Sequence, residues 1–292
     1  MATKVPAYSY NGTHSSEVKD GYWYIYLKSD GTLNFTYAQS GVQACIVGGG
    51  GGGEAYNVAL DRGGHGGGGG VVENMSGIDI AAGMEYPITI GAGGAVGGNG
   101  TASSAFGYTA SGGECAGGNC GLSIEDKAGT NGGNGTYAFG DTSLVRYGAG
   151  GGGGGSNDIE TPGNGGSTGG GKGGYGAAFS TGTAAVAGVA NTGSGGGGAG
   201  QDNNWTDDDG HKWAGGGAAA EGGSGIVILR GTQDDELPVY FDGMQLSEIY
   251  FNGEKVSGLI YGGMRLFARR VKVWLSKCMA HRFEFRRAIL AL

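Results

Sequence analysis

Glycine makes up one quarter of this chain, 73 of 292 residues, and most of it lies in one segment. Residues 48–225 hold 63 of these glycines, whereas 4 precede the segment and 6 follow it. Glycine brings no side chain to bury and loses the most backbone freedom on folding, so this segment fits neither an ordinary helix nor an ordinary sheet. Ordering it costs on the order of 200 kcal/mol of backbone entropy, which favours disorder unless many specific contacts form.

Three features indicate that the segment nevertheless folds. Linker-type runs of Ser, Glu or Lys are scarce, apolar islands recur, and the segment ends in the apolar stretch 226–229. Collagen is excluded, because the chain has only 4 prolines and its glycines come in blocks instead of at every third position. The largest blocks are residues 48–53, 66–70, 150–155 and 195–198. They predict a bundle of extended polyproline-II-type strands, whose N–H and C=O groups bond to neighbouring strands that glycine allows to approach closely.

Aromatic and β-branched stretches around the glycine segment predict a mainly-β fold. Residues 22–27 and 32–37 are rich in these types and flank Ser29-Asp30-Gly31, so we expect them to form a hairpin. Further strands are expected at residues 42–47, 86–90, 105–110 and 226–229. Short, widely spaced strands of this kind favour a β-sandwich from whose end the glycine-rich bundle or loop insertion projects.

A ten-residue repeat follows the glycine segment between residues 239 and 266. Its Asp-Gly, Asn-Gly and Gly-Gly pairs place Gly243, Gly253 and Gly263 ten residues apart. Such pairs are preferred by two-residue type I′ turns, so the repeat predicts a small β-meander of four strands with these glycines in its turns. Because so small a repeat rarely folds alone, we expect it to dock on the main body or to form a trimer with copies of itself.

The last 28 residues, Arg265–Leu292, carry eight Lys or Arg and one Glu, although the whole chain has a net charge of −8. Apolar positions at near-helical spacing predict a basic amphipathic helix. This tail is either docked or frayed, or it contacts nucleic acid or a membrane. Residues 2–11 contain no apolar core of a signal peptide, and no window approaches the ~18 apolar residues of a membrane span. We therefore expect no membrane insertion and no secretion by the general route.

Composition and pattern together divide the chain into four expected parts. Residues 1–47 form the N-terminal strands, 48–231 the glycine-rich domain with interspersed strands, 232–267 the meander, and 268–292 the basic tail.

No residue pattern typical of a catalytic, cofactor or metal site stands out. Residues 44–53 run from a strand into glycines as in dinucleotide-binding folds, but no helix follows to receive a pyrophosphate. The four histidines are far apart, and the Asp and Glu residues do not form an obvious catalytic pair. Cys115 and Cys120 are either free thiols or a small disulfide, and two thiols alone make no metal site. We expect no enzymatic activity, no cofactor and no metal.

The best candidate for recognition is an acidic, aromatic stretch enclosed by glycines. Its candidate receptor-contact residues are Trp205, Asp207, Asp208, Asp209, His211 and Trp213. Aromatic faces stack on sugars and dominate interfaces, and carboxylates accept hydrogen bonds from hydroxyl groups. The alternative, that one of the two tryptophans packs in the core, stays open. Residues 119–136 and 157–164 are weaker candidates of the same kind.

Several strings in the chain resemble a known family. They are Gly31–Thr36, Cys45–Gly50, Tyr86–Gly94, Ser104–Gly107 and Gly223–Arg230, of which Tyr86–Gly94 is the most specific. From Gly21 to Gly231 the chain resembles the glycine-rich domain of bacteriophage tail-fibre and related virion proteins. The resemblance implies polyglycine-II helices arranged as a sandwich whose distal loops touch the host receptor. A glycine-rich region also occurs in certain receptor tyrosine kinases, but the lack of a signal peptide, dense cysteines and a membrane span speaks against that setting.

We therefore expect a non-enzymatic phage virion component, a tail-fibre or receptor-binding protein that presents loops on a rigid scaffold for host attachment. The alternative is a structural virion protein, such as a head fibre, decoration or baseplate subunit, without receptor binding. The expected partners are other virion proteins and a host-surface glycan or protein receptor, with no nucleic acid. A homo-oligomer, for example a trimer, is expected, located in the virion.

Overall fold

In the computed structural model the chain divides into two compact units, Met1–Asp235 and Glu236–Leu292. The structure describes residues 2, 4–55, 63–117, 119–123, 128–155, 161–177, 180–201, 205–206, 212–213, 217–232, 239–241, 244–246, 250–251 and 254–255. These residues form strands, extended segments and one short 3-10 helix, η1 (Ala138–Gly140), but no α-helix. The predicted mainly-β class is confirmed.

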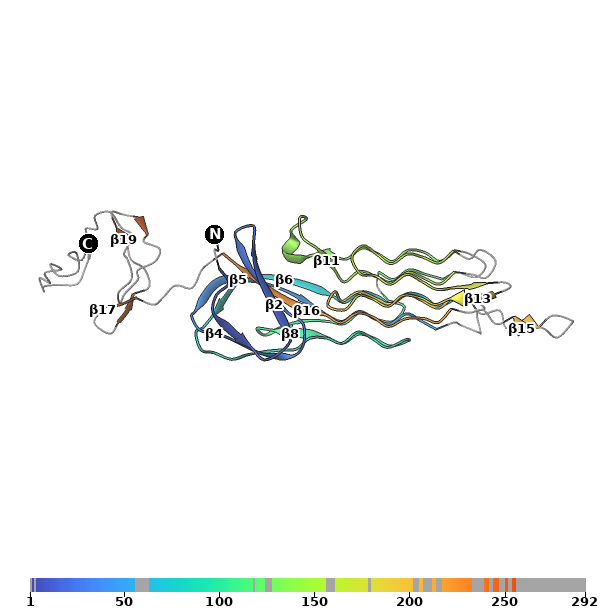
Figure 1. Cartoon of the computed structure of the whole chain (residues 1–292), viewed down its shortest axis with the longest axis horizontal. Coiled ribbons are helices and arrows are strands. Elements are labelled where there is room, and N and C mark those ends of the chain that lie inside the picture. Colours follow the sequence, from blue (N-terminus) through green and yellow to red (C-terminus); the bar gives the residue numbers. More distant parts are fainter. Residues whose placement is uncertain are drawn as a thin grey trace, which may run out of the picture. The chain divides into compact units, whose positions relative to one another are not determined.

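The largest sheet has five antiparallel strands, and β16 (Ile226–Gly231) lies in its centre (Figure 1). The strand order is β2 (His14–Lys19), β3 (Tyr22–Leu27), β16, β5 (Gln39–Val47) and β6 (Val72–Ile80). Every residue of β16 is buried, as its continuous apolar run predicts for a strand covered on both faces. The strands expected at residues 22–27, 42–47 and 226–229 are confirmed.

A second sheet has three antiparallel strands in the order β1 (Tyr8–Tyr10), β4 (Gly31–Phe35) and β7 (Tyr86–Ile88). The hairpin expected for residues 22–27 and 32–37 is wrong, because β3 and β4 lie in different sheets. The chain crosses from one sheet to the other within residues 28–30. Both strands send fully buried side chains, Ile25 and Leu33 among them, into one core, so they contribute to it from two sheets.

The single strand expected at residues 105–110 is also wrong. It is a hairpin of β8 (Ser103–Ala105) and β9 (Tyr108–Ala110). The two residues between the strands, Phe106 and Gly107, have φ of 52° and 81°, which is the left-handed backbone that a type I′ turn requires. Phe106 packs its ring 5.3 Å from that of Tyr86, and this contact accompanies the unusual conformation of a bulky residue.

One hydrophobic cluster takes side chains from both sheets. Its largest fully buried members are Trp23, Ile25, Leu27, Leu33, Phe35, Ile46, Ile80 and Leu229. A smaller cluster on the other face of the five-stranded sheet is covered by η1 and by the hairpin of β10 (Thr136–Tyr137) and β11 (Arg146–Tyr147). Arg230 holds this cover in place, with its guanidinium carbon 4.3 Å from the ring centre of Phe139 and its Nε donating to Gln43 Oε1 at 2.5 Å.

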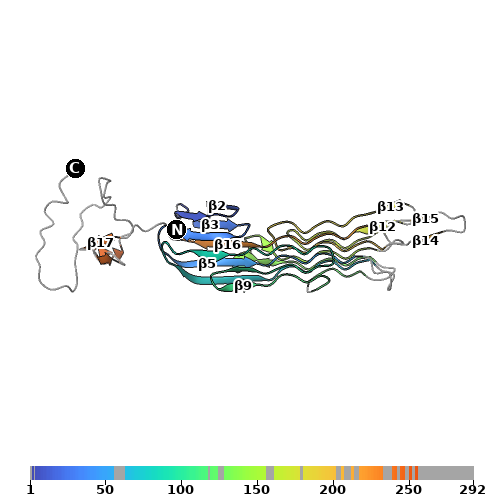
Figure 2. The ribbon, with the colours of Figure 1, turned by 90° about the horizontal axis from the view of Figure 1, so that it is seen from below.

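The glycine segments run side by side away from the sheets and are joined by backbone hydrogen bonds (Figure 2). In the run 48–54, every third N–H group donates to the same neighbouring segment. The acceptors are residues 65–71 (for Gly48, Gly51 and Glu54), 98–101 (for Gly49 and Gly52) and 220–223 (for Gly50 and Gly53). The carbonyl groups of this run accept from three further segments, residues 94–97, 113 and 196–199. The run thus lies among six neighbours and bonds with a period of three residues.

The same arrangement surrounds the run 150–155. Its N–H groups donate to residues 130–133, 64–67 and 171–174, and its carbonyls accept from residues 121, 163–166 and 198–201. Glycines 48–53, 150–155 and 195–198 are all buried. At Gly152 an added Cβ would lie within 3.0 Å of the Gly163 carbonyl oxygen, so only glycine permits this approach.

Four short strands lie beyond the glycine runs in the first unit: β12 (Tyr175–Ala177), β13 (Ser180–Thr183), β14 (Trp205–Thr206) and β15 (Lys212–Trp213). The second unit contains two hairpins, β17 (Val239–Phe241) with β18 (Met244–Leu246), and β19 (Tyr250–Phe251) with β20 (Glu254–Lys255). Two residues separate the strands of each hairpin. Gly243, Gly253, Gly263 and the basic tail 268–292 lie outside the described residues, so the turns expected there stay a prediction.

Candidate recognition site

Glycine strands from distant parts of the chain end together on the side away from the sheets. The N–H of Glu54 donates to the His65 carbonyl at 2.8 Å, and the Glu54 carbonyl accepts from the N–H of Ala199 at 3.0 Å. One layer further across the bundle, the Gly155 carbonyl accepts from the N–H of Gln201 at 3.1 Å. The strands that lead to residues 55, 155 and 201 therefore end at about the same position along the bundle.

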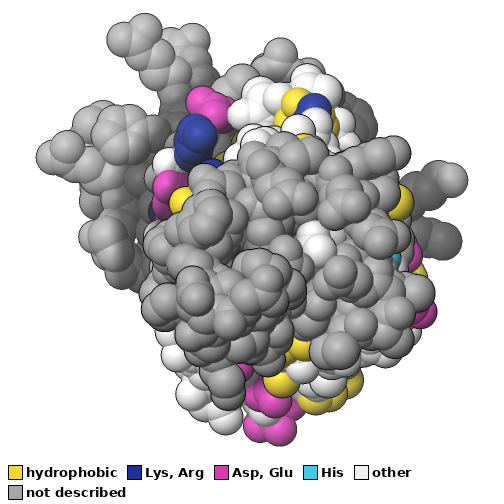
Figure 3. All heavy atoms as spheres, turned by 90° about the vertical axis from the view of Figure 1, so that its right-hand side faces the viewer, with side chains coloured by type: hydrophobic (Ala, Val, Ile, Leu, Met, Phe, Trp, Pro, Cys, Tyr) yellow, Lys and Arg dark blue, Asp and Glu magenta, His cyan; other side chains and the backbone are white. Residues whose placement is uncertain are grey.

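Described residues that flank five stretches of the chain lie at this end, namely 55 and 63, 123 and 128, 155 and 161, 177 and 180, and 201 and 217. The stretches between them, apart from β14 and β15, lie outside the described residues. Figure 3 views the molecule from this side, where acidic, basic and hydrophobic side chains all occur among the described residues. The backbone thus gathers segments that are up to about 150 residues apart in the sequence, which no local pattern could indicate.

The candidate recognition stretch contains a two-stranded hairpin. Trp205 of β14 pairs with Trp213 of β15, and Thr206 pairs with Lys212; Figure 2 labels the two strands. The structure therefore brings the two tryptophan positions opposite each other, where the sequence had only placed them eight residues apart. The other candidates, Asp207, Asp208, Asp209 and His211, belong to the connection between these strands and lie outside the described residues.

Part of the weaker candidate 119–136 serves inside the bundle. Asn131 Oδ1 accepts from the N–H of Asn164 at 2.8 Å, and Asn134 Oδ1 accepts from the N–H of Ser167 at 2.9 Å. The donors are three residues apart and so are the acceptors, which matches the period of the bundle. The spacing of the two asparagines was visible in the sequence, but its meaning depended on knowing that period.

His65 lies close to the same end, and hydrogen bonds account for its placement. Its Nδ1 accepts from the N–H of Ser123 at 2.9 Å, and its own N–H donates to Glu54 Oε2 at 3.2 Å. An imidazole whose Nδ1 accepts a backbone hydrogen bond is held as one tautomer and oriented by the bundle. These contacts give His65 a role in joining two glycine strands.

The two cysteines near this end, Cys115 and Cys120, are free thiols in the structure. Burial raises the pKa of both thiols, and the nearby Glu54 raises it further. A raised pKa keeps a thiol protonated and poorly nucleophilic. In the part of the chain that the structure describes, no group of three or more His, Cys, Asp and Glu side chains is placed to hold a metal ion.

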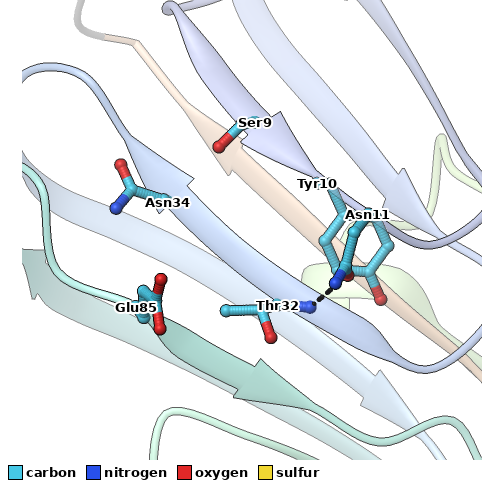
Figure 4. A pocket seen from close by; sticks show the side chains of 6 residues that line it. All are labelled: Ser9, Tyr10, Asn11, Thr32, Asn34 and Glu85. Carbon is cyan, nitrogen blue, oxygen red and sulfur yellow. Dashed lines mark hydrogen bonds between the residues drawn. The ribbon is translucent and has the colours of Figure 1, made fainter.

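A shallow depression of about 310 Å³ lies on the three-stranded sheet (Figure 4). It is lined by Ser9, Tyr10, Asn11, Thr32, Asn34 and Glu85. Asn11 Oδ1 accepts from the N–H of Thr32 at 2.7 Å, so one of these polar groups is already engaged. The lining holds a single carboxylate, whereas acid–base hydrolysis of a glycosidic bond typically uses two.

A second open depression, of about 490 Å³, lies beside the β10–β11 hairpin. The Arg146 side chain in this depression already interacts with Tyr137. Its Nη2 donates to the Tyr137 hydroxyl at 2.8 Å, and its guanidinium carbon lies 4.3 Å from the centre of the Tyr137 ring.

The sequence matches no model of a known protein family, and no relative was found among curated proteins. Within the described residues no helix is long and apolar enough to cross a membrane.

Proposed function

We propose that this chain is a non-enzymatic virion component of a bacteriophage, a tail-fibre or receptor-binding protein that presents loops on a rigid glycine scaffold for host attachment. The observation that carries the proposal is that the described residues flanking five stretches of the chain lie together at one end of the glycine strands. Binding residues generally lie on loops that a rigid scaffold positions. The resemblance of residues 21–231 to phage glycine-rich domains supports the same proposal.

The scaffold that we propose is a bundle of polyproline-II-type glycine helices extending from a β-sandwich. A polyproline-II helix has three residues per turn and no internal hydrogen bonds, so its backbone groups must bond outward in three directions. Along 48–54 the same bonded neighbour recurs every three residues, and the run 150–155 bonds to six neighbouring segments. Helices of this kind require both features. The core shared by the five-stranded and three-stranded sheets supports the sandwich.

Such a bundle would be stiff enough to hold a binding surface. Each buried run is tied to six neighbours, and a side chain cannot enter between them, as Gly50 and Gly152 illustrate. Sequence changes in the connections at the end leave these runs untouched. A scaffold of this kind therefore suits a protein whose contact loops vary while its support stays constant.

The best-supported contact is the hairpin that places Trp205 opposite Trp213. We expect that changing both tryptophans to Ala abolishes binding of the purified full-length protein to host bacteria, because each aromatic hot spot contributes ~2 kcal/mol or more. Binding is measured by flow cytometry with labelled protein on candidate host cells, and melting is recorded in parallel.

Tyr108→Ala is the matched control, because this aromatic side chain is 49% exposed and lies on β9, among the sheets. It should bind like the wild type. Binding lost in the double variant with unchanged melting supports the receptor tip. If the double variant binds cells as the wild type does, receptor contact at this hairpin is refuted, and the structural virion role becomes the better proposal. Loss of folding would instead mean that the tryptophans belong to the core.

A further inference from the structure

Residues 182–191 form an edge of the glycine bundle and repeat their environment every three residues. Gly182, Ala185, Gly188 and Asn191 are half-buried, and the residues between them are exposed. The N–H groups of Ala185 and Gly188 donate to residues 218–221, and those of Val186 and Val189 donate to residues 169–172. The Val186 carbonyl also accepts from the N–H of Gly197. This strand therefore has three hydrogen-bonded neighbours, whereas each central run has six.

The open sides of this strand carry backbone groups without partners. Among the hydrogen bonds of the described residues, none satisfies the N–H or carbonyl groups of Ala184, Ala187 or Ala190. All three alanines are exposed, and next to them Val186 and Val189 expose 55% and 54% of their surface. The edge therefore combines a row of free donors and acceptors with a stripe of small apolar side chains.

Side chains close parts of other edges of the bundle. Asn131 and Asn134 cap two N–H groups that lie three residues apart on a neighbouring strand, and Thr101 Oγ1 accepts from the N–H of Ala92 at 2.8 Å. Residues 182–191 contain no Asp, Glu, Lys or Arg, the side chains with which proteins commonly protect an edge from another chain. At Ala184 and Ala187 the edge is thus both uncapped and uncharged.

We propose that this edge is a docking site for a polyproline-II segment of a partner polypeptide, with glycine at the positions that face the bundle. Free donors every three residues along a polyproline-II strand are about 9.3 Å apart, and carbonyls at every third residue of a second such strand repeat at the same distance. A β-strand offers its carbonyls on one edge every two residues, or about 6.8 Å, and falls out of step. The proposal rests on the threefold conformation inferred above, and it is independent of receptor binding.

A second copy of this chain fits the edge less well. Between the run 48–54 and any one of its neighbours, all hydrogen bonds run in the same direction, from donor strand to acceptor strand. A twofold pairing of identical edges must exchange bonds in both directions, because each copy makes the contacts of the other. The bonding pattern of the bundle therefore favours a different strand as the occupant.

The test uses the full-length protein labelled with ¹⁵N and the probe peptide (Pro-Gly-Gly)4, in which proline favours the polyproline-II conformation and glycine permits close approach. We expect saturable amide shifts at Ala184, Ala187 and Ala190. The peptide (Gly-Gly-Ser)4, equally rich in glycine but without that conformational bias, should bind at least several-fold more weakly. Shifts that do not saturate, or that map elsewhere on the protein, overturn the proposal.

Ala187→Pro provides a sharper comparison, because proline keeps the polyproline-II backbone but removes the free N–H. It should weaken peptide binding by about tenfold, whereas Ala187→Ser, which retains the N–H, should bind like the wild type. Equal binding by the two variants contradicts the docking site. Unfolding of Ala187→Pro would count against the threefold conformation itself, and the amide-shift map of the wild type still decides the docking. Concentration-dependent shifts of the same amides without peptide would assign the edge to self-association and overturn the proposal.

Discussion

Replacing Gly152 by Ala should destabilise the first unit far more than a methyl group usually does. Gly152 is buried, and its Cβ would lie within 3.0 Å of the Gly163 carbonyl oxygen and carbon. Because the neighbour is backbone, it cannot turn aside as a flexible side chain would. Relief requires moving a strand, which stretches the bond from Gly152 N–H to the Gly171 carbonyl and the bond from Gly198 N–H to the Gly152 carbonyl, both in place at 2.8 and 3.0 Å.

Two weakened hydrogen bonds at about 1 kcal/mol each, plus about 1–3 kcal/mol for overpacking, give a loss of about 3–5 kcal/mol. For a unit of this size that corresponds to a fall in the melting temperature of about 6–20 °C, measured by differential scanning calorimetry. Gly98→Ala is the matched control, since its Cβ would meet its nearest atom at 3.2 Å and the others at 3.5 Å or more. It should change stability by less than about 1 kcal/mol. If the two variants melt alike, the close packing around Gly152 is refuted.

Three further changes test other parts of the structure. Arg230→Lys should lower the free energy of unfolding by about 2–3 kcal/mol, because lysine cannot both bond Gln43 Oε1 and stack on Phe139. Arg146→Lys is the control and should cost less than about 1 kcal/mol, because Arg146 stacks on a partly exposed ring. Equal losses for the two variants in chemical denaturation would contradict this role of Arg230. Hydrogen bonds from Ser143, aided by Arg230, hold the pKa of Asp141 below its usual value, so its stabilising effect is present above the unfolded pKa and is lost on acidification. The stability advantage of the wild type over Asp141→Asn should therefore disappear between about pH 5 and about pH 2, and a difference that grows on acidification would reverse the sign of this argument. Gly253→Val should destabilise the second unit by about 1–3 kcal/mol, since a β-branched residue resists positive φ, and an unchanged melting transition would show that the turn is misassigned.

The features predictable from the sequence were those that depend on local composition. Continuous apolar runs predicted the strands β5 and β16. The hairpin of residues 22–27 and 32–37 failed because alternation of apolar residues tells which face is buried, not which sheet a strand joins. Strand β2 was missed because all its residues are exposed, although the Asp20-Gly21 pair before β3 was a usable signal.

The bundle and the candidate site were harder to predict, because they depend on pairing between segments far apart in the sequence. Glycine blocks indicated close-packed extended strands, but Gly48, Gly49 and Gly50 bond to segments near residues 71, 101 and 223. Glycine carries no side chain whose pattern could identify these partners. The strand ends that meet at one end of the bundle follow from the pairing, so their meeting could not be anticipated. Only the individual stretch from Trp205 to Trp213 could be selected in advance.

The most direct test of the scaffold is amide hydrogen exchange of the full-length protein, followed by NMR. We expect strong protection for the N–H groups of residues 48–53, 150–155 and 195–198, comparable to that of β5 in the sheet, because each of them is buried and bonded to another strand. The free N–H groups of Ala184, Ala187 and Ala190 should exchange rapidly and serve as an internal reference. Exchange of the three buried glycine runs at the rate of these alanines would contradict the account.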